Sequence, residues 1–444
     1  MKRKCFTAVC CLGLSLAVLP LSACQPKQPA QGSASGEAAL DMHGYEFIIG
    51  SHYAGYSDLQ RGSYRMADLY LDKYEEIERL YNCKISFRAY PSDGTIASEV
   101  HTSIMAGDKP FDILDAPLKT FYSLLASKDL YAQNTIAALD LASPNMNQQI
   151  TKAGTWNGNV YGSKYTYTDN IPGIFYNKDV LEAKGIEDPG EIYKRGEWTF
   201  TKLKEQLTVA TGATDSGSRT YGMVISNAIS EFFLYAGGGG KVLDKGDNNW
   251  IFGLDDPRSM AVVQYLRDLR KQKVFHPESM WDKVSKAFAE GEAAFFPYYI
   301  WSAASTFSKL DINYGFVPFP KMDGTEQGAP YVQDCRMFMM PKNLPNPEYT
   351  GLIYNKLAEL GPDSRSDQID YYKSIGADDN TIRFFKEMSD QFKLVPGGGA
   401  QTVDADLAYY GAWQTSTKEP ASEFAAVKSK TQANLDEFKN LITK

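Results

Sequence analysis

Apolar and polar positions along the chain follow two periods, and their order predicts an open α/β sheet. Short apolar runs typical of strands occur at 45–50, 85–89 and 111–114. Between them, apolar residues recur at helical spacing through 65–82 and 96–104. The order is therefore β-α-β-α-β, which predicts parallel strands because a parallel pair needs a crossover connection.

The later part of the chain repeats this pattern and ends in helices. Further strands are expected at 173–176, 221–225, 293–296 and 313–317. Helices are expected at 179–184, 203–210, 257–272, 283–290, 404–416 and 424–442. Thr199 or Thr201 is expected to cap the helix at 203–210, since a Thr hydroxyl can accept a hydrogen bond from a free backbone N–H. At roughly 100 to 200 residues per domain, 444 residues correspond to two or three domains.

The N-terminal segment has the pattern of a secretion signal. Three basic residues at 2–4 precede an apolar run at 5–19, which is too short to span a bilayer comfortably. The sequence Leu-Ser-Ala-Cys at 21–24 resembles the lipobox of bacterial lipoproteins. We therefore expect 1–23 to be a lipoprotein signal peptide and Cys24 to carry the lipid. The alternative is an ordinary secretory signal with an incidental cysteine.

The segment that follows predicts a tether to the membrane. Within the expected tether at 24–40, residues 25–39 are rich in Gln, Pro, Ala, Gly and Ser and lack the large apolar residues of a core. The folded part, from residue 41, is then expected at the outer face of the cytoplasmic membrane. Two cysteines, Cys83 and Cys335, remain in that part. They form either a disulfide or two buried free thiols.

Composition and motifs favour a binding protein over an enzyme. The net charge of -8 makes nucleic acid an improbable partner. The chain has no nucleophile elbow, no H-E-x-x-H, no C-x-x-C and no P-loop, because Val242 follows Gly240 and Lys241 where a P-loop needs Ser or Thr. Its four histidines are scattered, so we expect no metal site. From the missing motifs we also expect no cofactor and no catalytic residues. The 28 Tyr, 23 Phe and 6 Trp exceed what core packing needs, so some rings are expected to face a ligand.

Six segments, in order, resemble one protein family. They are 103–114, 156–162, 174–179, 197–200, 288–295 and 312–320. They are similar to the A-G-x-x-P-D turn, the G-K-x-Y-G hairpin, the Y-Y-N-K-D strand, the W-T helix start, F-x-x-G-x-A-A-M and Y-G-x-x-P-x-P. These motifs are those of the extracellular solute-binding proteins of ABC importers, in the sugar-binding group related to maltose-binding protein (bacterial family 1).

The resemblance implies an α/β fold of the type II periplasmic-binding-protein class. Each of two lobes is expected to be a mostly parallel sheet flanked by helices, with ligand held between the lobes. The hinge is expected to be crossed near 168–171, near 314–319 and near Gly376. Lobe 1 is then 41–168 plus 317–375, and lobe 2 is 169–316 plus 376–444. The family also implies a monomer that delivers its ligand to membrane permease subunits.

Candidate ligand-binding residues follow from the loops at the carboxyl ends of strands, where open α/β sheets bind ligands. Clefts for sugars combine aromatic rings with polar side chains. The candidates are Trp301, Asp115, Trp413, Tyr53, Tyr165, Tyr167, Glu231, Tyr298, Tyr299, Asp334, Arg336, Tyr409 and Tyr410. Just past the strand at 111–114 the chain has Ala116 and Pro117, where maltose-binding protein has an aromatic, so that relative's sugar preference is not carried over.

The function expected from the sequence is therefore a lipid-anchored receptor that binds a carbohydrate, specifically an oligosaccharide. Three alternatives stay open. The same fold could hold a peptide or another polar solute. The chain could be a cell-surface glycoside hydrolase, which needs two carboxylates about 5 to 9.5 Å apart across the cleft. It could also be a sensor subunit that docks onto a membrane kinase.

Overall fold

The computed structural model describes residues 40–443 except 54–58, 63–65, 169, 214–216, 218, 247–248, 308–311, 334, 398–401 and 416. The predicted signal peptide, Cys24 and the candidate Asp334 lie outside the described residues. Among the described residues, no helix is both long and apolar enough to cross a membrane.

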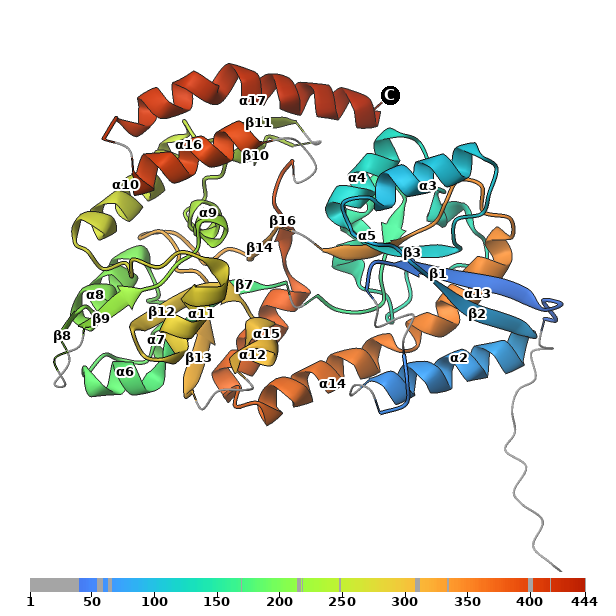
Figure 1. The fold of residues 1–444 in the computed structure, drawn as a ribbon, viewed down its shortest axis with the longest axis horizontal. Coiled ribbons are helices and arrows are strands. Elements are labelled where there is room, and N and C mark those ends of the chain that lie inside the picture. Colours follow the sequence, from blue (N-terminus) through green and yellow to red (C-terminus); the bar gives the residue numbers. More distant parts are fainter. Residues whose placement is uncertain are drawn as a thin grey trace, which may run out of the picture. The chain divides into compact units, whose positions relative to one another are not determined.

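The first lobe is built on a five-stranded sheet in the order β2-β1-β3-β15-β6 (Figure 1). Its strands are β1 (Tyr45–Ser51), β2 (Cys83–Ala89), β3 (Ile113–Pro117), β6 (Gly162–Ser163) and β15 (Arg336–Met339). As predicted, β1 pairs in parallel with β2 and β3, whereas β15 runs antiparallel to β3. α3 (Ile96–Met105) and α4 (Leu118–Ala126) supply apolar residues to one core, and α2 (Ala67–Tyr81) and α13 (Pro347–Ala358) to another.

The second lobe has a five-stranded sheet in the order β13-β7-β12-β9-β8. Its strands are β7 (Pro172–Asn177), β8 (Gly212–Ala213), β9 (Arg219–Met223), β12 (Ala293–Tyr299) and β13 (Tyr314–Val317). Only the β9–β12 pair is parallel; β7 runs antiparallel to both β12 and β13. The expected arrangement of mostly parallel strands therefore does not hold for this sheet. The reason is that β7 pairs with β12 and β13, which come more than a hundred residues later in the chain, so no single β-α-β crossover sets their relative direction.

Helices and short strands complete the two lobes. In the first lobe and its connections these are η1 (Gln133–Thr135), α5 (Gln148–Ala153), β4 (Thr155–Trp156), β5 (Asn159–Val160), β14 (Tyr331–Val332) and α14 (Gly361–Ser374); β16 (Lys393–Leu394) comes later in the chain and pairs with β14. In the second they are α6 (Lys178–Ala183), α7 (Pro189–Lys194), α8 (Phe200–Ala210), α9 (Asn227–Ala236), β10 (Val242–Asp244), β11 (Trp250–Phe252), α10 (Pro257–Lys271), α11 (Trp281–Ala289), α12 (Ser302–Ser305), α15 (Asp379–Asp390), α16 (Val403–Gln414) and α17 (Pro420–Thr443).

Most predicted elements are confirmed to within a few residues. Thr199 caps α8 by accepting a hydrogen bond from the backbone N–H of Lys202. β9 spans Arg219–Met223, two residues earlier than the predicted strand. Cys83 and Cys335 are both buried thiols and neither is disulfide-bonded, so the second of the two alternatives for these residues holds.

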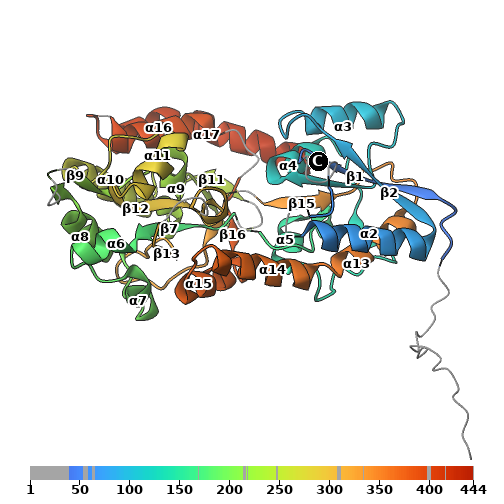
Figure 2. The ribbon, with the colours of Figure 1, turned by 60° about the horizontal axis from the view of Figure 1, so that its bottom comes forward.

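α14 leads the chain from the first lobe to the second. Figure 2 shows it running from α13, which packs on α2, to α15, which packs on β13. After α14 the chain turns at Gly376, whose φ of +93° favours glycine. Asp378 then begins α15, and its carboxylate accepts a hydrogen bond of 2.7 Å from the backbone N–H of Thr381. The turn at Gly376 thus leads directly into a capped helix start.

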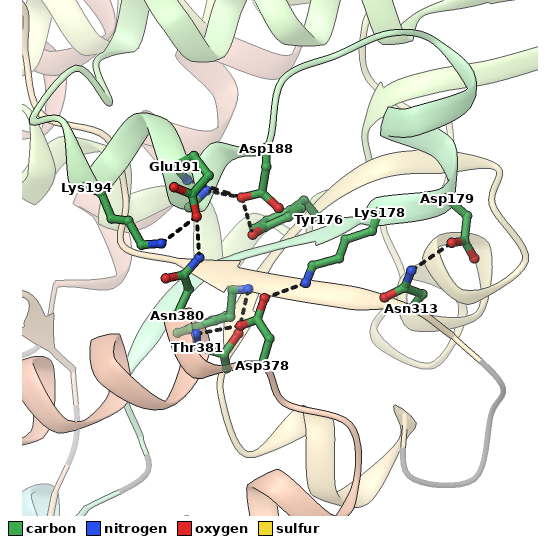
Figure 3. A network of polar contacts seen from close by, with 12 residues as sticks. Tyr176, Lys178, Asp179, Asp188, Glu191, Lys194, Asn313, Asp378, Asn380 and Thr381 are labelled. Carbon is green, nitrogen blue, oxygen red and sulfur yellow. Dashed lines mark hydrogen bonds and ion pairs between the residues drawn. The ribbon is translucent and has the colours of Figure 1, made fainter.

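A polar network fixes this helix start to the second sheet (Figure 3). Asp378 forms an ion pair with Lys178, the residue directly after β7. The hydroxyl of Thr381 accepts a hydrogen bond of 3.1 Å from the backbone N–H of Phe316 in β13. Burial raises the pKa of Asp378, but Lys178 and the N–H of Thr381 outweigh burial, and the pKa is lowered overall.

α17 reaches both lobes. It packs on α16 and β11 of the second lobe and on α4 of the first. Phe438 of α17 stacks on Trp250 of β11 at 5.9 Å and meets Tyr122 of α4 edge-on at 5.5 Å. Trp250 also lies 6.1 Å from Trp156. We call Tyr122, Trp156, Trp250 and Phe438 the four-ring contact.

Candidate functional site

A charged cluster lies at the carboxyl end of β3 in the first lobe. Asp115 in β3 is 2% exposed, and a buried carboxylate is costly unless it is paired. Arg336 starts the neighbouring β15, and its Nη2 donates a hydrogen bond of 2.6 Å to the backbone oxygen of Asp115. Its Nε lies 3.4 Å from the Asp115 carboxylate, which also pairs with Lys164 at 3.0 Å. The carboxylate therefore lies between two cations.

Arg336 connects this cluster to two surface loops. Its Nη1 donates a hydrogen bond of 3.0 Å to Asp93, in the loop after β2. Its guanidinium carbon lies 4.3 Å from the ring centre of Tyr53, in the loop after β1. Burial lowers the pKa of Arg336, but Asp115 and Asp93 raise it more, so the guanidinium stays charged. Tyr53 is 52% exposed and presents its ring to solvent.

An aromatic cluster lies at the carboxyl end of β12 in the second lobe. Tyr299 and Trp301 are nearly parallel, with an interplanar angle of 10° and ring centres 6.2 Å apart. Tyr298 meets Trp301 edge-on at 5.5 Å and stacks on Phe296 at 5.3 Å. Burial raises the pKa of Tyr298. Tyr299 and Trp301 are half-buried, so parts of their rings remain accessible.

Gln333 holds the ring of Tyr299. The Tyr299 hydroxyl donates a hydrogen bond of 3.2 Å to the Gln333 side-chain oxygen. Gln333 belongs to the connection between β13 and β15, so this bond links the aromatic cluster to the chain that returns to the first lobe.

Several predicted residues lie inside their lobes. Tyr165 is 2% exposed and stacks on Phe338 at 5.3 Å. Tyr409 is fully buried, and its hydroxyl donates a hydrogen bond of 2.7 Å to the backbone oxygen of Ser230. Trp413 is 3% exposed and lies 5.6 Å from Phe275. The helices and loops that carry these rings direct them toward the interior of each lobe, and not toward a ligand.

Glu231 belongs to a buried charged group. It pairs with Lys241, which also lies 2.5 Å from Asp406 of α16. Burial raises the pKa of Glu231 and disfavours the Lys241 ammonium, but the two carboxylates together keep Lys241 charged. The group joins α9, the turn at 237–241 that carries Lys241, and α16, so its role is structural.

Tyr167 and Tyr410 are half-buried and contact residues outside the two clusters described first. The guanidinium carbon of Arg365 lies 4.4 Å from the ring centre of Tyr167. Tyr410 lies 5.5 Å from Tyr409 on α16. The structure thus brings Tyr53, Asp115 and Arg336 together, and separately Tyr298, Tyr299 and Trp301.

Sequence reasoning missed three participants in these clusters. Asp93 lies four residues after the predicted strand at 85–89, in a loop of the kind that supplied other candidates. Lys164 directly precedes the candidate Tyr165, and Gln333 precedes Asp334. Their positions beside strand ends were the available signal. Among the described residues, no group of three or more His, Cys, Asp or Glu could hold a metal ion.

The two clusters offer complementary chemistry. The charged cluster presents the partly exposed carboxylate of Asp93 and the edge of the Arg336 guanidinium, which form directed hydrogen bonds. The aromatic cluster presents flat apolar faces. Ring-shaped hydroxylated molecules have both apolar faces and hydroxyl groups, so this combination suits them.

Comparison with known sequences matches a family model and curated relatives. The sequence pattern of the family described as bacterial extracellular solute-binding protein matches residues 70–357. Maltodextrin-binding protein MdxE of Bacillus subtilis strain 168 is 27% identical over 193 residues, which cover 41% of this chain and 42% of that protein. The match thus spans about two fifths of the relative's length.

Solved structures share the fold over most of the chain. The cyclic alpha-maltosyl-1,6-maltose binding protein from Arthrobacter globiformis superimposes with a TM-score of 0.66 at 15% identity, covering 89% of this chain and 100% of that chain. UgpB from Mycobacterium tuberculosis, in complex with glycerophosphocholine, gives a TM-score of 0.63 at 15% identity, covering 89% and 98%. At these identities the likeness concerns the fold alone, and it confirms the expected two-lobe architecture.

Proposed function

The chain belongs to the bacterial extracellular solute-binding protein family, and from that premise we propose that it captures a carbohydrate between its lobes for an ABC importer. As a member of this family it is a binding protein and not an enzyme. The finer substrate that we propose is an oligosaccharide, which agrees with the maltodextrin-binding name of the curated relative.

The half-buried stack of Tyr299 and Trp301 carries this proposal. Two nearly parallel rings at a strand end form a platform for the apolar face of a sugar ring. Arg336 and Asp93 would supply hydrogen bonds to hydroxyl groups from the other lobe, and the buried Asp115 would hold Arg336 in place. A ligand that touches both clusters favours the closed arrangement of the lobes, since it gains contacts there that the open arrangement lacks.

We propose lobes at 41–168 plus 317–375 and at 169–316 plus 376–444. Sheet membership supports this division, because β1, β2, β3, β6 and β15 share one sheet and β7, β8, β9, β12 and β13 the other. Val317 still pairs with Ile174 of the second sheet, which favours a second crossing just after Val317. The third crossing would lie at Gly376, where α14 has ended and α15 begins.

The proposed setting of the receptor follows from the N-terminal pattern and the family. A lipid on Cys24 would anchor the chain at the outer face of the cytoplasmic membrane, with 25–40 as a tether. The chain would act as a monomer and deliver its ligand to permease subunits.

Replacing Trp301 tests the proposed platform. A panel of mono- and oligosaccharides is first screened by thermal unfolding of the full-length protein, since a ligand at about a hundredfold its dissociation constant stabilises the native state by about 2.7 kcal/mol. For a sugar that shifts the midpoint, Trp301→Ala is expected to weaken binding about tenfold or more. Trp301→Phe, which keeps a ring, is expected to weaken it less.

Unchanged affinity in Trp301→Ala would remove that residue from the site. No shift with any sugar would overturn the carbohydrate proposal while leaving the family intact.

A second candidate ligand is a charged polar solute. The cluster of Asp115, Arg336 and Lys164 concentrates charges of both signs at one edge of the first sheet. UgpB, which shares the fold, was solved with glycerophosphocholine. Including phosphodiesters and short peptides in the same panel separates the candidates, because a midpoint shift with these and none with sugars would favour the charged solute.

A further inference from the structure

A cavity of about 260 Å³ lies beside the four-ring contact. Tyr122, Trp156 and Trp250 of that contact line it, together with the end of α5 and residues 392–397 around β16. No residue of the charged cluster or of the aromatic cluster is part of this lining. Within the second lobe, Figure 1 shows β10 and β11 in the upper half of the view, below α17, and α12, which directly follows Trp301, in the lower half. The cavity is therefore apart from the ring stack proposed for a sugar.

Three rings give this cavity flat apolar walls. Trp250 lies 6.1 Å from Trp156 with an interplanar angle of 48°, and it meets Tyr122 edge-on at 6.2 Å. All three side chains are more than nine-tenths buried, so packing fixes their positions. Rings at such angles suit a flat occupant, because one ring can offer its face and another its edge.

The indole N–H of Trp156 is a hydrogen-bond donor without an acceptor in the part of the chain that the structure describes. Trp156 is 6% exposed, and a buried donor without a partner raises the free energy of the folded state. An occupant that brings an acceptor to this N–H removes that cost. The occupant is therefore expected to carry an oxygen with free lone pairs beside its flat part.

The charged side chains of the lining favour an anion. Two of them are basic, Lys152 and Lys393, and one is acidic, Asp244. Neither lysine has an ion-pair partner among the described residues. The Asp244 carboxylate already accepts a hydrogen bond of 2.8 Å from the backbone N–H of Gly246. The lining thus carries an excess of one positive charge in a chain whose net charge is -8, which favours a negatively charged occupant.

We propose that this cavity binds a small aromatic carboxylate. Its volume lies just under the roughly 300 to 1,000 Å³ of common ligand pockets, which suits a molecule with one ring. The ligand ring would lie among the three aromatic walls, and a small turn of the Trp156 indole would let its N–H donate to a carboxylate oxygen. Lys152 and Lys393 would pair with the same carboxylate. The inference does not rest on the proposed function, because neither of the two clusters takes part.

Benzoate, titrated into the full-length protein with its tryptophans labelled with nitrogen-15, tests the site by magnetic resonance. The chain has six tryptophans, so the indole N–H resonances are few, and single Trp→Phe changes assign each of them by its loss. We expect benzoate to shift the resonances of Trp156 and Trp250 to saturation and to leave that of Trp301 unchanged. No shift of Trp156 and Trp250 at any soluble benzoate concentration would overturn the site.

Replacing the proposed partners separates their roles, with the Trp250 resonance as the readout. Trp156→Phe keeps a ring but removes the N–H, and we expect it to weaken benzoate binding about tenfold. Lys152→Gln and Lys393→Gln are each expected to weaken it about threefold. Lys119→Gln, at an exposed lysine of α4 outside the lining, is the matched control and should leave the affinity unchanged.

Two analogues of benzoate test the ligand class. Benzamide keeps the ring without the charge, and cyclohexanecarboxylate keeps the charge without the flat ring. Both are expected to bind about fivefold or more weakly than benzoate. Binding of either analogue as tight as that of benzoate would reject an aromatic carboxylate as the ligand.

Trp301→Ala separates this site from the proposed cleft. Shifts of Trp156 and Trp250 that disappear in Trp301→Ala would mean that benzoate acts from the cleft, and would overturn the second site but not the proposed function. Unchanged affinity in Trp156→Phe, Lys152→Gln and Lys393→Gln would also reject the site. If circular dichroism shows that Trp156→Phe does not fold, the two changes at exposed lysines decide the outcome.

Discussion

At the scale of single residues, Arg336 joins three segments of the first lobe. It contacts Asp115 in β3, Asp93 in the loop after β2 and Tyr53 in the loop after β1. Its side chain is 12% exposed and the Asp115 side chain 2%. The pair is therefore largely removed from water, where loss of one partner leaves a buried charge without its full compensation.

Replacing Arg336 is expected to destabilise the protein. Arg336→Ala leaves Asp115 with Lys164 as its remaining cation, so we expect a loss of about 1 to 3 kcal/mol in the free energy of unfolding. Arg195→Ala is the matched control, because Arg195 pairs with Glu187 and Glu197 at the surface. Urea unfolding measures both. Equal effects of the two changes would contradict a special role for Arg336.

Asp378 gives a prediction about pH. Its pKa is lowered in the folded protein, so its contribution to stability is fully present above the ordinary carboxyl pKa near 4 and is lost as the pH falls below that. Asp378→Asn keeps a good helix cap but loses the charge that pairs with Lys178. We expect it to lower the free energy of unfolding by about 1 kcal/mol at pH 7 and by less at pH 3, because the deficit fades as the pH falls from the ordinary carboxyl pKa through the lowered pKa of Asp378.

The comparison needs unfolding curves at both pH values. Asp378→Ala, which removes the cap as well, is expected to be destabilising at pH 3 too. A deficit of Asp378→Asn that does not shrink at low pH would show that the ion pair with Lys178 is not its cause.

Residue roles were predictable from sequence only in part. A residue's place beside a strand end could be read from the pattern, which placed Asp115, Tyr299 and Trp301 there; their role in ligand binding stays a prediction. The direction in which a side chain points could not be read from the sequence, because it depends on how loops and helices pack. Tyr165 and Tyr299 occupy similar positions near strand ends, yet Tyr165 is buried against Phe338 and Tyr299 is partly accessible.

At the scale of elements, periodicity predicted helices and strands well. The apolar stripe of the last helix predicted α17, and β-α-β-α-β order predicted the parallel β1, β2 and β3. The strand directions in the second sheet were not predictable, because β7 and β13 pair across more than a hundred residues of sequence. Pairing partners that far apart leave no local signal.

The four-ring contact gives a prediction about α17. Phe438→Ala removes a half-buried ring that touches both Trp250 and Tyr122, and we expect it to cost about 2 kcal/mol in the free energy of unfolding. Leu441→Ala on the same helix is expected to change it by about 0.5 kcal/mol or less, because Leu441 is 53% exposed. Denaturant unfolding of the two variants measures both losses. Equal losses in the two variants would contradict a packing role for Phe438.

At the scale of the whole molecule, the two buried thiols report on global unfolding. Burial raises the pKa of Cys83 to about 11, so its thiol is protonated and unreactive at neutral pH. Cys335 is fully buried. We expect a thiol reagent to modify both cysteines only as fast as the molecule unfolds, and peptide mapping by mass spectrometry resolves the two sites. Rapid modification in native buffer would contradict this burial.

The place of β15 in the first sheet has a consequence for the timing of biosynthesis. β15 lies beside β3, although about 220 residues separate them, and α13 covers α2 from still later in the chain. While the ribosome is still making the second lobe, β3 has no neighbour on one side, and the nascent first lobe is unfinished. The polypeptide would therefore stay unfolded long enough to be threaded through a translocation pore before it acquires a structure that resists passage.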